Sequence, residues 1–241
     1  MSKAKVFNSV RVEPLSTRIV QQVLEALFAK ELKAGQFLGT EAQLAEAFKT
    51  SRMPIREALG RLEALGVLHV KPGAAGGATI AQGEPDQFAT ALSVQFALIE
   101  ATAEEIFDAR IAIETRAAEL AAQHATADDL ARLEDLLRTI QKHDAEGRSA
   151  VETIMAFHHA IVAASGSRTL TALMHGLTQP LVSLYTLSPS RLTGKGTRYR
   201  GLSDIFASIK VKDSRGAHER MHDHLVAQRD RIVSDLAIAS E

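Results

Sequence analysis

The 241-residue chain contains no cysteine and no tryptophan. The absence of cysteine excludes a disulfide framework, a thiolate metal site and a cysteine nucleophile. No apolar run approaches the roughly 18–20 residues that a transmembrane helix needs, so no membrane span is expected. The first residues, Met-Ser-Lys-Ala-Lys-Val-Phe, also lack the apolar segment of an export signal, and we expect a cytoplasmic protein.

What is present is a globular composition, with 46% hydrophobic and 24% charged residues. The formal net charge is only −1, but the charge is unevenly distributed. Residues 1–82 carry 11 Lys and Arg against 7 Asp and Glu, whereas residues 83–241 carry 17 against 22. A Gly and a Pro interrupt the pattern within residues 82–86. We therefore expect two domains, residues 1–82 and 83–241, with different partners.

Apolar spacing and capping signals predict three helices in the first domain. They are expected over residues 17–31, from Thr40 onward, and from Pro54 to Gly66. Two short strands, residues 67–71 and 78–81, are expected to form a hairpin around a glycine-rich tip. A nucleotide-binding loop is a weaker interpretation of these glycines, because the spacing of neither a dinucleotide fingerprint nor a P-loop is present.

Arg52 precedes the third expected helix, and Arg56 lies on it outside the apolar stripe. Positive side chains are thus placed at the N-terminal end of this helix. In a helix-turn-helix that end enters the major groove, where the planar guanidinium of Arg matches guanine or a phosphate. The pattern favours a winged helix that binds DNA.

This region resembles the winged helix-turn-helix of GntR-type bacterial transcription regulators. The resemblance is carried by Gly35, Thr40-Glu-Ala-Gln-Leu-Ala45, Ser51-Arg-Met-Pro-Ile-Arg-Glu-Ala-Leu59 and Leu62-Glu-Ala-Leu-Gly66. It implies that Arg52 and Arg56 read DNA, that Thr40 and Ser51 belong to the same surface, and that Gly76 and Gly77 form the wing tip.

The second domain shows helical periodicity and no convincing strand alternation. Helices are expected near residues 86–100, 103–124, 127–146, 150–165, 168–187, 198–212 and 214–237. Capping boxes at Thr102 and Thr126 mark two of the starts. The expected fold class is therefore mainly α, a winged helix-turn-helix followed by an all-α antiparallel bundle.

Polar residues interrupt several apolar faces of these helices. His158 lies within one stripe, and His224 lies at the edge of another. Each histidine is interpreted either as a satisfied core residue or as a ligand-binding group. His218 and His222 have a spacing that occurs in zinc-binding helices, but without the rest of such a motif they are interpreted as a solvated face.

The second domain resembles the ligand-binding domain of the FadR subfamily, the FCD domain. The resemblance is carried by Arg110-Ile-Ala-Ile-Glu114, Leu120-Ala-Ala122, Phe157-His158, Ile161, Ala164-Ser-Gly166, Ser208-Ile209, Asp213, Ala217, Met221 and His224-Leu225. It implies an effector pocket in which an arginine binds a carboxylate. Arg110 is the positional candidate, and a structural ion pair with Glu114 is the alternative role.

Many members of that subfamily hold a divalent metal with one Asp and three His. The matching positions here are Ile154, His158, Leu202 and His224, so two ligands are replaced by aliphatic side chains. Because Ile and Leu offer no lone pairs, we predict no cofactor and no tightly bound metal, and at most a weak divalent-metal site at His158 and His224. The change favours an effector with a hydrophobic part.

These features predict a homodimeric transcription regulator, a repressor of a palindromic operator, controlled by an organic-acid or acyl-type effector. An all-helical enzyme that uses histidine, or a metal-dependent hydrolase, is the alternative. A structural DNA-binding protein without an effector is a third interpretation. A basic segment from Leu187 to Gly201 is interpreted as a solvated loop, with a lid or an anion contact as the alternatives.

Overall fold

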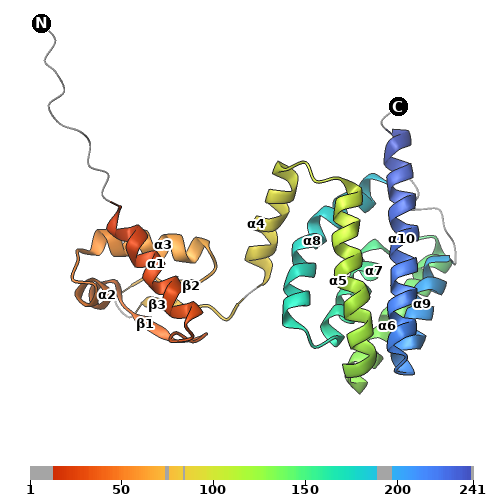
Figure 1. Cartoon of the computed structure of the whole chain (residues 1–241), viewed down its shortest axis with the longest axis horizontal. Coiled ribbons are helices and arrows are strands. Elements are labelled where there is room, and N and C mark those ends of the chain that lie inside the picture. Colours follow the sequence, from red (N-terminus) through yellow and green to blue (C-terminus); the bar gives the residue numbers. More distant parts are fainter. Residues whose placement is uncertain (1–12, 74–75, 84, 189–196, 240–241) are drawn as a thin grey trace, which may run out of the picture. The chain divides into compact units, whose positions relative to one another are not determined.

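The computed structural model describes residues 13–73, 76–83, 85–188 and 197–239. The chain divides into two compact units, residues 1–87 and 88–241 (Figure 1). The first unit combines helices with a small sheet, and the second is helical.

The first unit is a winged helix. Its elements are α1 (Leu15–Phe28), β1 (Phe37–Gly39), α2 (Glu41–Ala47), α3 (Arg52–Ala64), β2 (Leu68–Lys71) and β3 (Gly77–Ile80). The three strands form an antiparallel sheet in the order β1-β3-β2. The three helices and the hairpin of β2 and β3 agree with the sequence-based prediction.

Helix α3 forms the centre of this unit because its apolar residues recur on one face. Ile55, Ala58 and Leu62 are almost completely buried, and they pack in one cluster with residues of α1 that include Ile19 and Val23. Helix α2 begins at the predicted capping box, in which Thr40 and Gln43 exchange hydrogen bonds between side chain and backbone. The capping box fixes the N-terminal end of α2, and the apolar cluster holds α3 against α1.

Strand β1 was missing from the sequence-based prediction. It is only three residues long and ends in a glycine, so it has no readable alternation. Phe37 pairs with Thr79 of β3, and Gly39 pairs with Ala78. A Cβ at Gly77 would lie 2.6 Å from the Phe37 ring and 2.7 Å from the carbonyl oxygen of Gly39. The close approach of β1 to β3 therefore requires glycine at position 77.

The second unit is a helical bundle, as predicted. Its helices are α4 (Pro85–Leu98), α5 (Ala103–His124), α6 (Ala127–Glu146), α7 (Val151–Ala164), α8 (Arg168–Leu187), α9 (Thr197–Lys210) and α10 (Ser214–Ala239). Both predicted capping boxes are present, at Thr102 and Thr126. Within the described residues, no helix is both long enough and apolar enough to cross a membrane.

Helix α5 packs against α7, α8, α9 and α10 (Figure 1). Small residues make this packing possible, because Ala117, Ala118 and Ala121 of α5 are fully buried. The same helix also carries the buried polar residues Arg110 and Glu114. Helix α5 therefore places charged groups inside an apolar bundle.

Candidate functional site

A hollow of about 560 Å³ lies on the winged-helix unit, between the helices α2 and α3 and the hairpin. It is lined by five of the six residues that the sequence assigned to DNA binding: Thr40, Arg52, Arg56, Gly76 and Gly77. The sixth, Ser51, is the exposed N-cap residue of α3. The fold thus brings residues from three separate segments to one surface.

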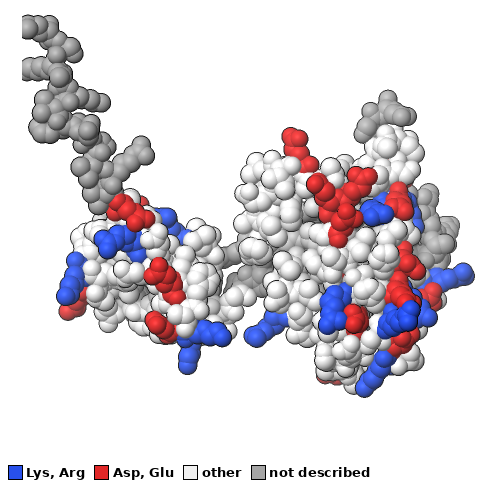
Figure 2. Space-filling model, in the orientation of Figure 1, with Lys and Arg blue, Asp and Glu red and all other residues white. Residues whose placement is uncertain are grey.

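The charge of this hollow is mainly positive. Arg52, Arg56 and Lys71 line it together with one acidic residue, Glu41. The two arginines and the lysine are exposed, so their charged groups are accessible to a polyanion. Figure 2 shows Lys and Arg side chains on the surface of this unit. A concave, basic surface beside a helix N-terminus fits the phosphates and the major groove of DNA.

Glu41 was missed as a site residue by sequence reasoning. Its carboxylate accepts two hydrogen bonds from Arg56, one from Nε at 3.0 Å and one from Nη2 at 2.8 Å. The hydrogen bond from Arg56 holds the pKa of Glu41 below its ordinary value, and Arg52 adds to this effect. A separation of 15 residues between Glu41 and Arg56 gave no local signal for this contact.

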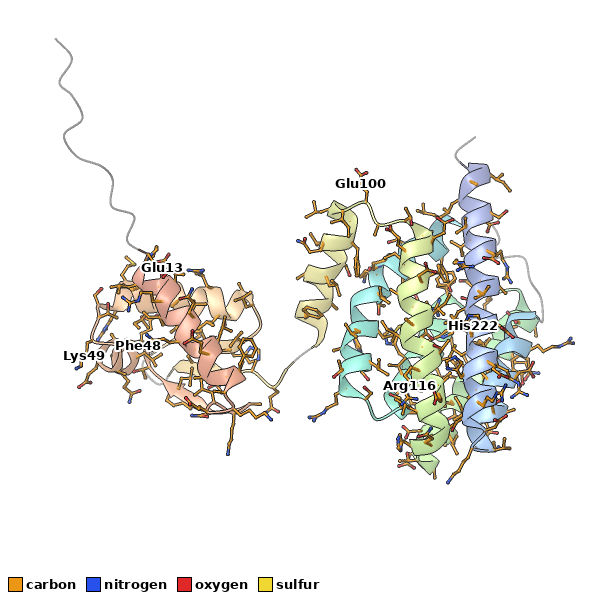
Figure 3. The ribbon with its side chains drawn as sticks, in the orientation of Figure 1. Glu13, Phe48, Lys49, Glu100, Arg116 and His222 are labelled. Carbon is orange, nitrogen blue, oxygen red and sulfur yellow. The ribbon has the colours of Figure 1, made fainter. Side chains whose placement is uncertain are left out.

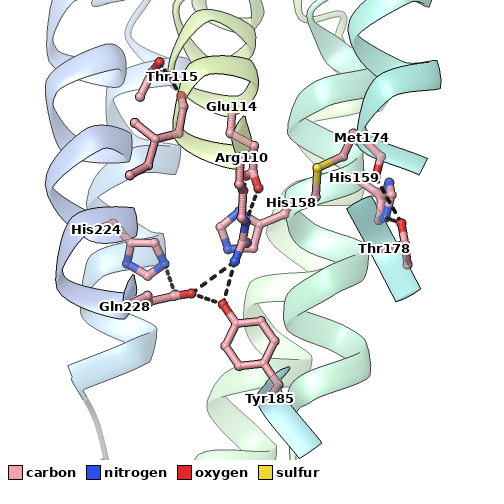
Figure 4. A network of polar contacts seen from close by, with 11 residues as sticks. Arg110, Glu114, Thr115, His158, His159, Met174, Thr178, Tyr185, His224 and Gln228 are labelled. Carbon is pink, nitrogen blue, oxygen red and sulfur yellow. Dashed lines mark hydrogen bonds and ion pairs between the residues drawn. The ribbon is translucent and has the colours of Figure 1, made fainter. Parts of the chain in front are cut away.

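The second candidate site is a buried polar network in the bundle (Figure 4). Arg110 of α5 donates from Nε to Glu114 Oε1 at 2.5 Å, and from Nη1 to the Tyr185 hydroxyl at 2.5 Å. Glu114 Oε2 lies 2.5 Å from Nδ1 of His158 on α7. Tyr185 donates to the side-chain oxygen of Gln228 on α10. Side chains from four helices therefore meet at one ion pair.

The charges in this network are set by burial and by the partners. Burial alone would raise the pKa of Glu114, but the Arg110 guanidinium and His158 hold it at about 2. Burial lowers the pKa of His158, which is thus neutral and donates its Nδ1 proton to the carboxylate. Arg110 stays protonated because Glu114 raises its pKa. The network contains one buried ion pair and a neutral imidazole.

His224 of α10 completes the network on the other side of His158. The two rings stack with centroids 5.6 Å apart. The amide nitrogen of Gln228 lies 2.5 Å from His224 Nε2 and donates a hydrogen bond to it. Burial lowers the pKa of His224 to about 3, and the nearby His158 and Arg110 act in the same direction. His224 is therefore also neutral at pH 7.

Two buried atoms of the network have no hydrogen-bond partner within the described residues, Nη2 of Arg110 and Nε2 of His158. The first is a donor, and the second is an acceptor because His158 uses its proton at Nδ1. Buried polar groups in proteins nearly always have partners. Within the described residues, Nη2 of Arg110 and Nε2 of His158 are therefore the two atoms of the network that remain for a further hydrogen-bond partner.

The residues at the positions that the resemblance assigns to a metal do not fit one. Ile154 and Leu202 are buried in the apolar cluster of the bundle and offer no ligand atoms. His224 Nε2 is already engaged by Gln228. In the part of the chain that the structure describes, no group of three or more His, Asp or Glu side chains could hold an ion.

The other predicted histidines lie at the surface, as the helical spacing indicated. His222 is exposed on α10 beside Asp223, and Figure 3 labels it together with Arg116 of α5. His218 is half exposed, with its Nδ1 3.6 Å from Glu119. The basic segment from Leu187 to Gly201 lies mostly outside the described residues, so its predicted role as a loop or lid stays a prediction.

Tyr185 and Gln228 were also missed by sequence reasoning. Gln228 follows His224 by four residues, so a contact along one face of α10 was a readable signal. Tyr185 gave no such signal, because it lies 75 residues from Arg110. Gly201 allows α9 to approach the site, since a Cβ there would lie 2.7 Å from His224 Nδ1.

Comparison with known proteins decides the family. Residues 15–76 match the model of the bacterial regulatory proteins of the gntR family, and residues 105–227 match that of the FCD domain. The chain is 30% identical over 207 residues to the HTH-type transcriptional regulator LutR of Bacillus subtilis, with 83% of this chain and 93% of LutR covered. The chain belongs to the GntR family.

Further relatives agree with this GntR assignment. The Uxu operon transcriptional regulator of Escherichia coli is 28% identical over 206 residues, which cover 83% of this chain and 79% of that protein. The solved structure of Streptococcus agalactiae GntR covers 89% of this chain and 99% of its own, with a TM-score of 0.65 and 25% identity.

The membership confirms the predicted fold class and the predicted kind of protein. This GntR-family member is a DNA-binding transcription regulator with an FCD domain, as in the FadR-like subfamily. Its winged helix is the DNA-binding part, and its FCD domain is the effector-binding part. It is not an enzyme, so the alternative of a histidine-based enzyme or a hydrolase is set aside.

Proposed function

We propose that this regulator is a cytoplasmic repressor whose operator binding is controlled by an effector in the helical bundle. Residues 1–82 bind DNA, and residues 83–241 bind the effector and form a homodimer. Effector binding shifts the population between dimers that can and cannot bind DNA. Two winged helices in a symmetric dimer read the two halves of a palindromic operator.

The surface proposed to bind DNA is the basic hollow of the winged helix. Arg52 and Arg56 contact base edges from the N-terminal end of α3. Thr40, Ser51 and the wing residues Gly76 and Gly77 contact the DNA backbone, which supplies affinity but no sequence information. The observation that supports this role is the convergence of these segments around one hollow.

The test is the double variant Arg52→Ala and Arg56→Ala. The wild-type protein is first used to enrich duplexes from a randomised DNA pool, and the enriched duplex becomes the probe. We expect the double variant to lose specific binding to that probe while its circular dichroism and its oligomeric state stay unchanged. Specific binding retained by the folded variant would contradict the role of α3.

The effector site is proposed at the buried network, because Arg110 Nη2 and His158 Nε2 lack partners within the described residues. Arg110 binds a carboxylate or carbonyl oxygen, and His158 accepts a hydrogen bond from a donor on the same molecule. The other proposed effector-binding residues are His224, Ile154 and Leu202. The two aliphatic residues favour an acyl or ring-bearing acid, or a thioester, over a small hydroxy acid.

A thermal-shift screen of organic acids, fatty acids and acyl thioesters tests this site. A true effector should raise the melting temperature and change the affinity for the enriched duplex. The shift should shrink in His224→Gln and persist in the surface control His218→Gln. A compound that acts equally on both variants binds elsewhere. Stoichiometric zinc or nickel in protein purified without a chelator would contradict the metal-free site.

The proposed homodimer is supported by helix α4. Among residues 88–98, whose side chains the structure describes, none is buried, although most are apolar. Figure 2 shows almost no charge over α4. Phe96 of α4 lines a hollow of about 260 Å³ together with Leu184 of α8. A helix whose residues are mostly apolar is normally covered, and a second copy would cover it without placing like charges together.

Light scattering tests the dimer. The wild-type protein should be a dimer at micromolar concentration, and Leu98→Asp on α4 should dissociate it. Val211→Asp is the matched control, because Val211 is similarly exposed at the end of α9. A wild-type monomer, or equal effects of the two variants, would contradict the proposed interface.

A further inference from the structure

The ion pair between Glu41 and Arg56 uses a particular edge of the guanidinium. A guanidinium has five N–H donors, one on Nε and two on each terminal nitrogen. Glu41 accepts from Nε and from Nη2, which together form one side of the plane. The end of the plane, formed by Nη1 and the second N–H of Nη2, points away from this carboxylate. Two parallel donors therefore remain for another partner.

The remaining edge has the shape that a guanine requires. In the major groove guanine presents O6 and N7, and an arginine binds both with two neighbouring N–H groups. Arg56 is exposed over 69% of its side chain and lines the basic hollow, so this edge is accessible. An arginine held on one side by a carboxylate presents its other donors in a fixed direction. Less conformational entropy is then lost when the side chain binds a base.

Stability does not explain this ion pair. Its glutamate is 31% exposed and its arginine more so, and exposed pairs contribute little to folding because water screens them. A carboxylate in this hollow also repels phosphates and thus weakens binding to any DNA. Glu41 thus lowers the affinity for any DNA and also holds a side chain that contacts bases. Its effect is on the difference in affinity between two DNA sequences.

We propose that Glu41 is a specificity-determining residue of the DNA-binding surface, which positions Arg56 for a base and keeps it from a phosphate. On DNA without the right base, Arg56 stays paired with Glu41 and contributes little. On the operator, the free edge of Arg56 binds the base while Glu41 keeps the other edge. This inference rests on the proposed role of α3 in DNA binding.

The experiment compares Glu41→Gln with the wild-type protein on two duplexes, the one that the wild type enriches and a scrambled one of equal composition. The amide keeps the size of the side chain but loses its charge and one acceptor. We expect the variant to bind scrambled DNA more tightly, with a salt dependence steeper by about one counterion. The ratio of the two affinities should fall about tenfold, within the range that one bidentate base contact provides.

Two controls separate positioning from charge. Glu46→Gln removes the same charge from an exposed position on the same helix, and Glu46 has no part in the ion pair with Arg56. It should strengthen binding to both duplexes equally and leave their ratio unchanged. Glu41→Asp keeps the charge, but its carboxylate is one methylene shorter, so the ratio should still fall.

A double-variant cycle completes the test. In an Arg56→Ala background, Glu41→Gln should no longer change the ratio, because the side chain that Glu41 positions is gone. The inference is overturned if Glu41→Gln leaves the ratio unchanged, or if Glu41→Asp behaves as the wild type. If the wild-type protein enriches no duplex at all, the proposed DNA-binding function fails first, and that result is distinct from a change in specificity.

Discussion

The winged-helix unit and the helical bundle each contain an arginine paired with a glutamate, and the two pairs differ in exposure. Arg56 and Glu41 are 69% and 31% exposed, whereas Arg110 and Glu114 are fully buried. Exposed pairs contribute little to stability, but removing one partner of a buried pair leaves an uncompensated charge. We therefore propose that the same chemistry serves recognition in the exposed pair and stabilises the fold in the buried pair.

The largest expected effect is in the buried pair. Glu114→Gln leaves Arg110 without a carboxylate and should lower the unfolding free energy by about 3–5 kcal/mol. The two tyrosines, Tyr185 and Tyr199, both lie in the bundle, and the chain has no tryptophan. Tyrosine fluorescence during urea denaturation therefore reports on this unit alone.

Glu119→Gln on the same helix is the matched control. Glu119 forms an exposed salt bridge with Arg116, so its replacement should change the unfolding free energy little. Equal destabilisation by the two variants would show that burial of the pair is not the cause.

The second effect concerns pH. The pKa of His224 is about 3 in the folded protein, against about 6.5 for a histidine in an unfolded chain. Between these values the unfolded chain binds a proton that the folded protein does not, so stability falls as the pH falls from 7 to 5. Glu114 loses its charge only below this window.

His224→Gln removes this titration. The loss of unfolding free energy between pH 7 and pH 5 should therefore be smaller in the variant by about 2 kcal/mol. Urea denaturation at the two pH values measures it, and His218→Gln controls for the loss of a surface histidine. An unchanged pH dependence in His224→Gln would mean that the pKa of His224 is not lowered in the folded protein.

The third effect is shared by both units. Thr102→Ala removes the N-cap of α5, and Thr40→Ala removes that of α2; each should cost about 1 kcal/mol. Tyrosine fluorescence should register the change at α5, whereas circular dichroism is needed for α2. Thr102→Ser keeps the capping hydroxyl and should restore most of the stability. A serine as destabilising as the alanine would argue against capping as the cause.

The smallest effect belongs to the exposed pair. Arg56→Ala should leave thermal unfolding, followed by circular dichroism, unchanged, because water already solvates both charges. A marked decrease in melting temperature would show that the pair between Arg56 and Glu41 stabilises the fold. It would contradict the proposed difference between the exposed and the buried pair.

Local patterns predicted the elements better than the sites. The bounds of α5, α6 and α8 agree with the prediction because an N-cap residue directly precedes each helix and apolar spacing runs through it. Strand β1 was missed, since its three residues depend on pairing with β3, far along the chain. The sheet is therefore larger than the hairpin that was predicted.

The partners of the arginines show the same limit. Arg110 and Glu114 are four residues apart on one helix, so their pairing was one of two readable roles. The fold alone brings three further residues to the arginines: Glu41, Tyr185 and Gln228. Composition and periodicity could not predict these contacts. The sequence therefore singled out Arg56 and Arg110 as candidates, and the structure shows which side chains contact them.

We propose that the exposed pair governs DNA discrimination and that the buried pair governs stability. The most direct measurement determines both quantities for Glu41→Gln and Glu114→Gln: the urea unfolding free energy, and the affinity ratio between enriched and scrambled DNA in the absence of denaturant. We predict that Glu41→Gln has a lower affinity ratio than the wild type and an unchanged unfolding free energy. We predict that Glu114→Gln has a lower unfolding free energy and, under conditions in which it is folded, an unchanged affinity ratio. Loss of the same quantity in both variants would contradict the claim.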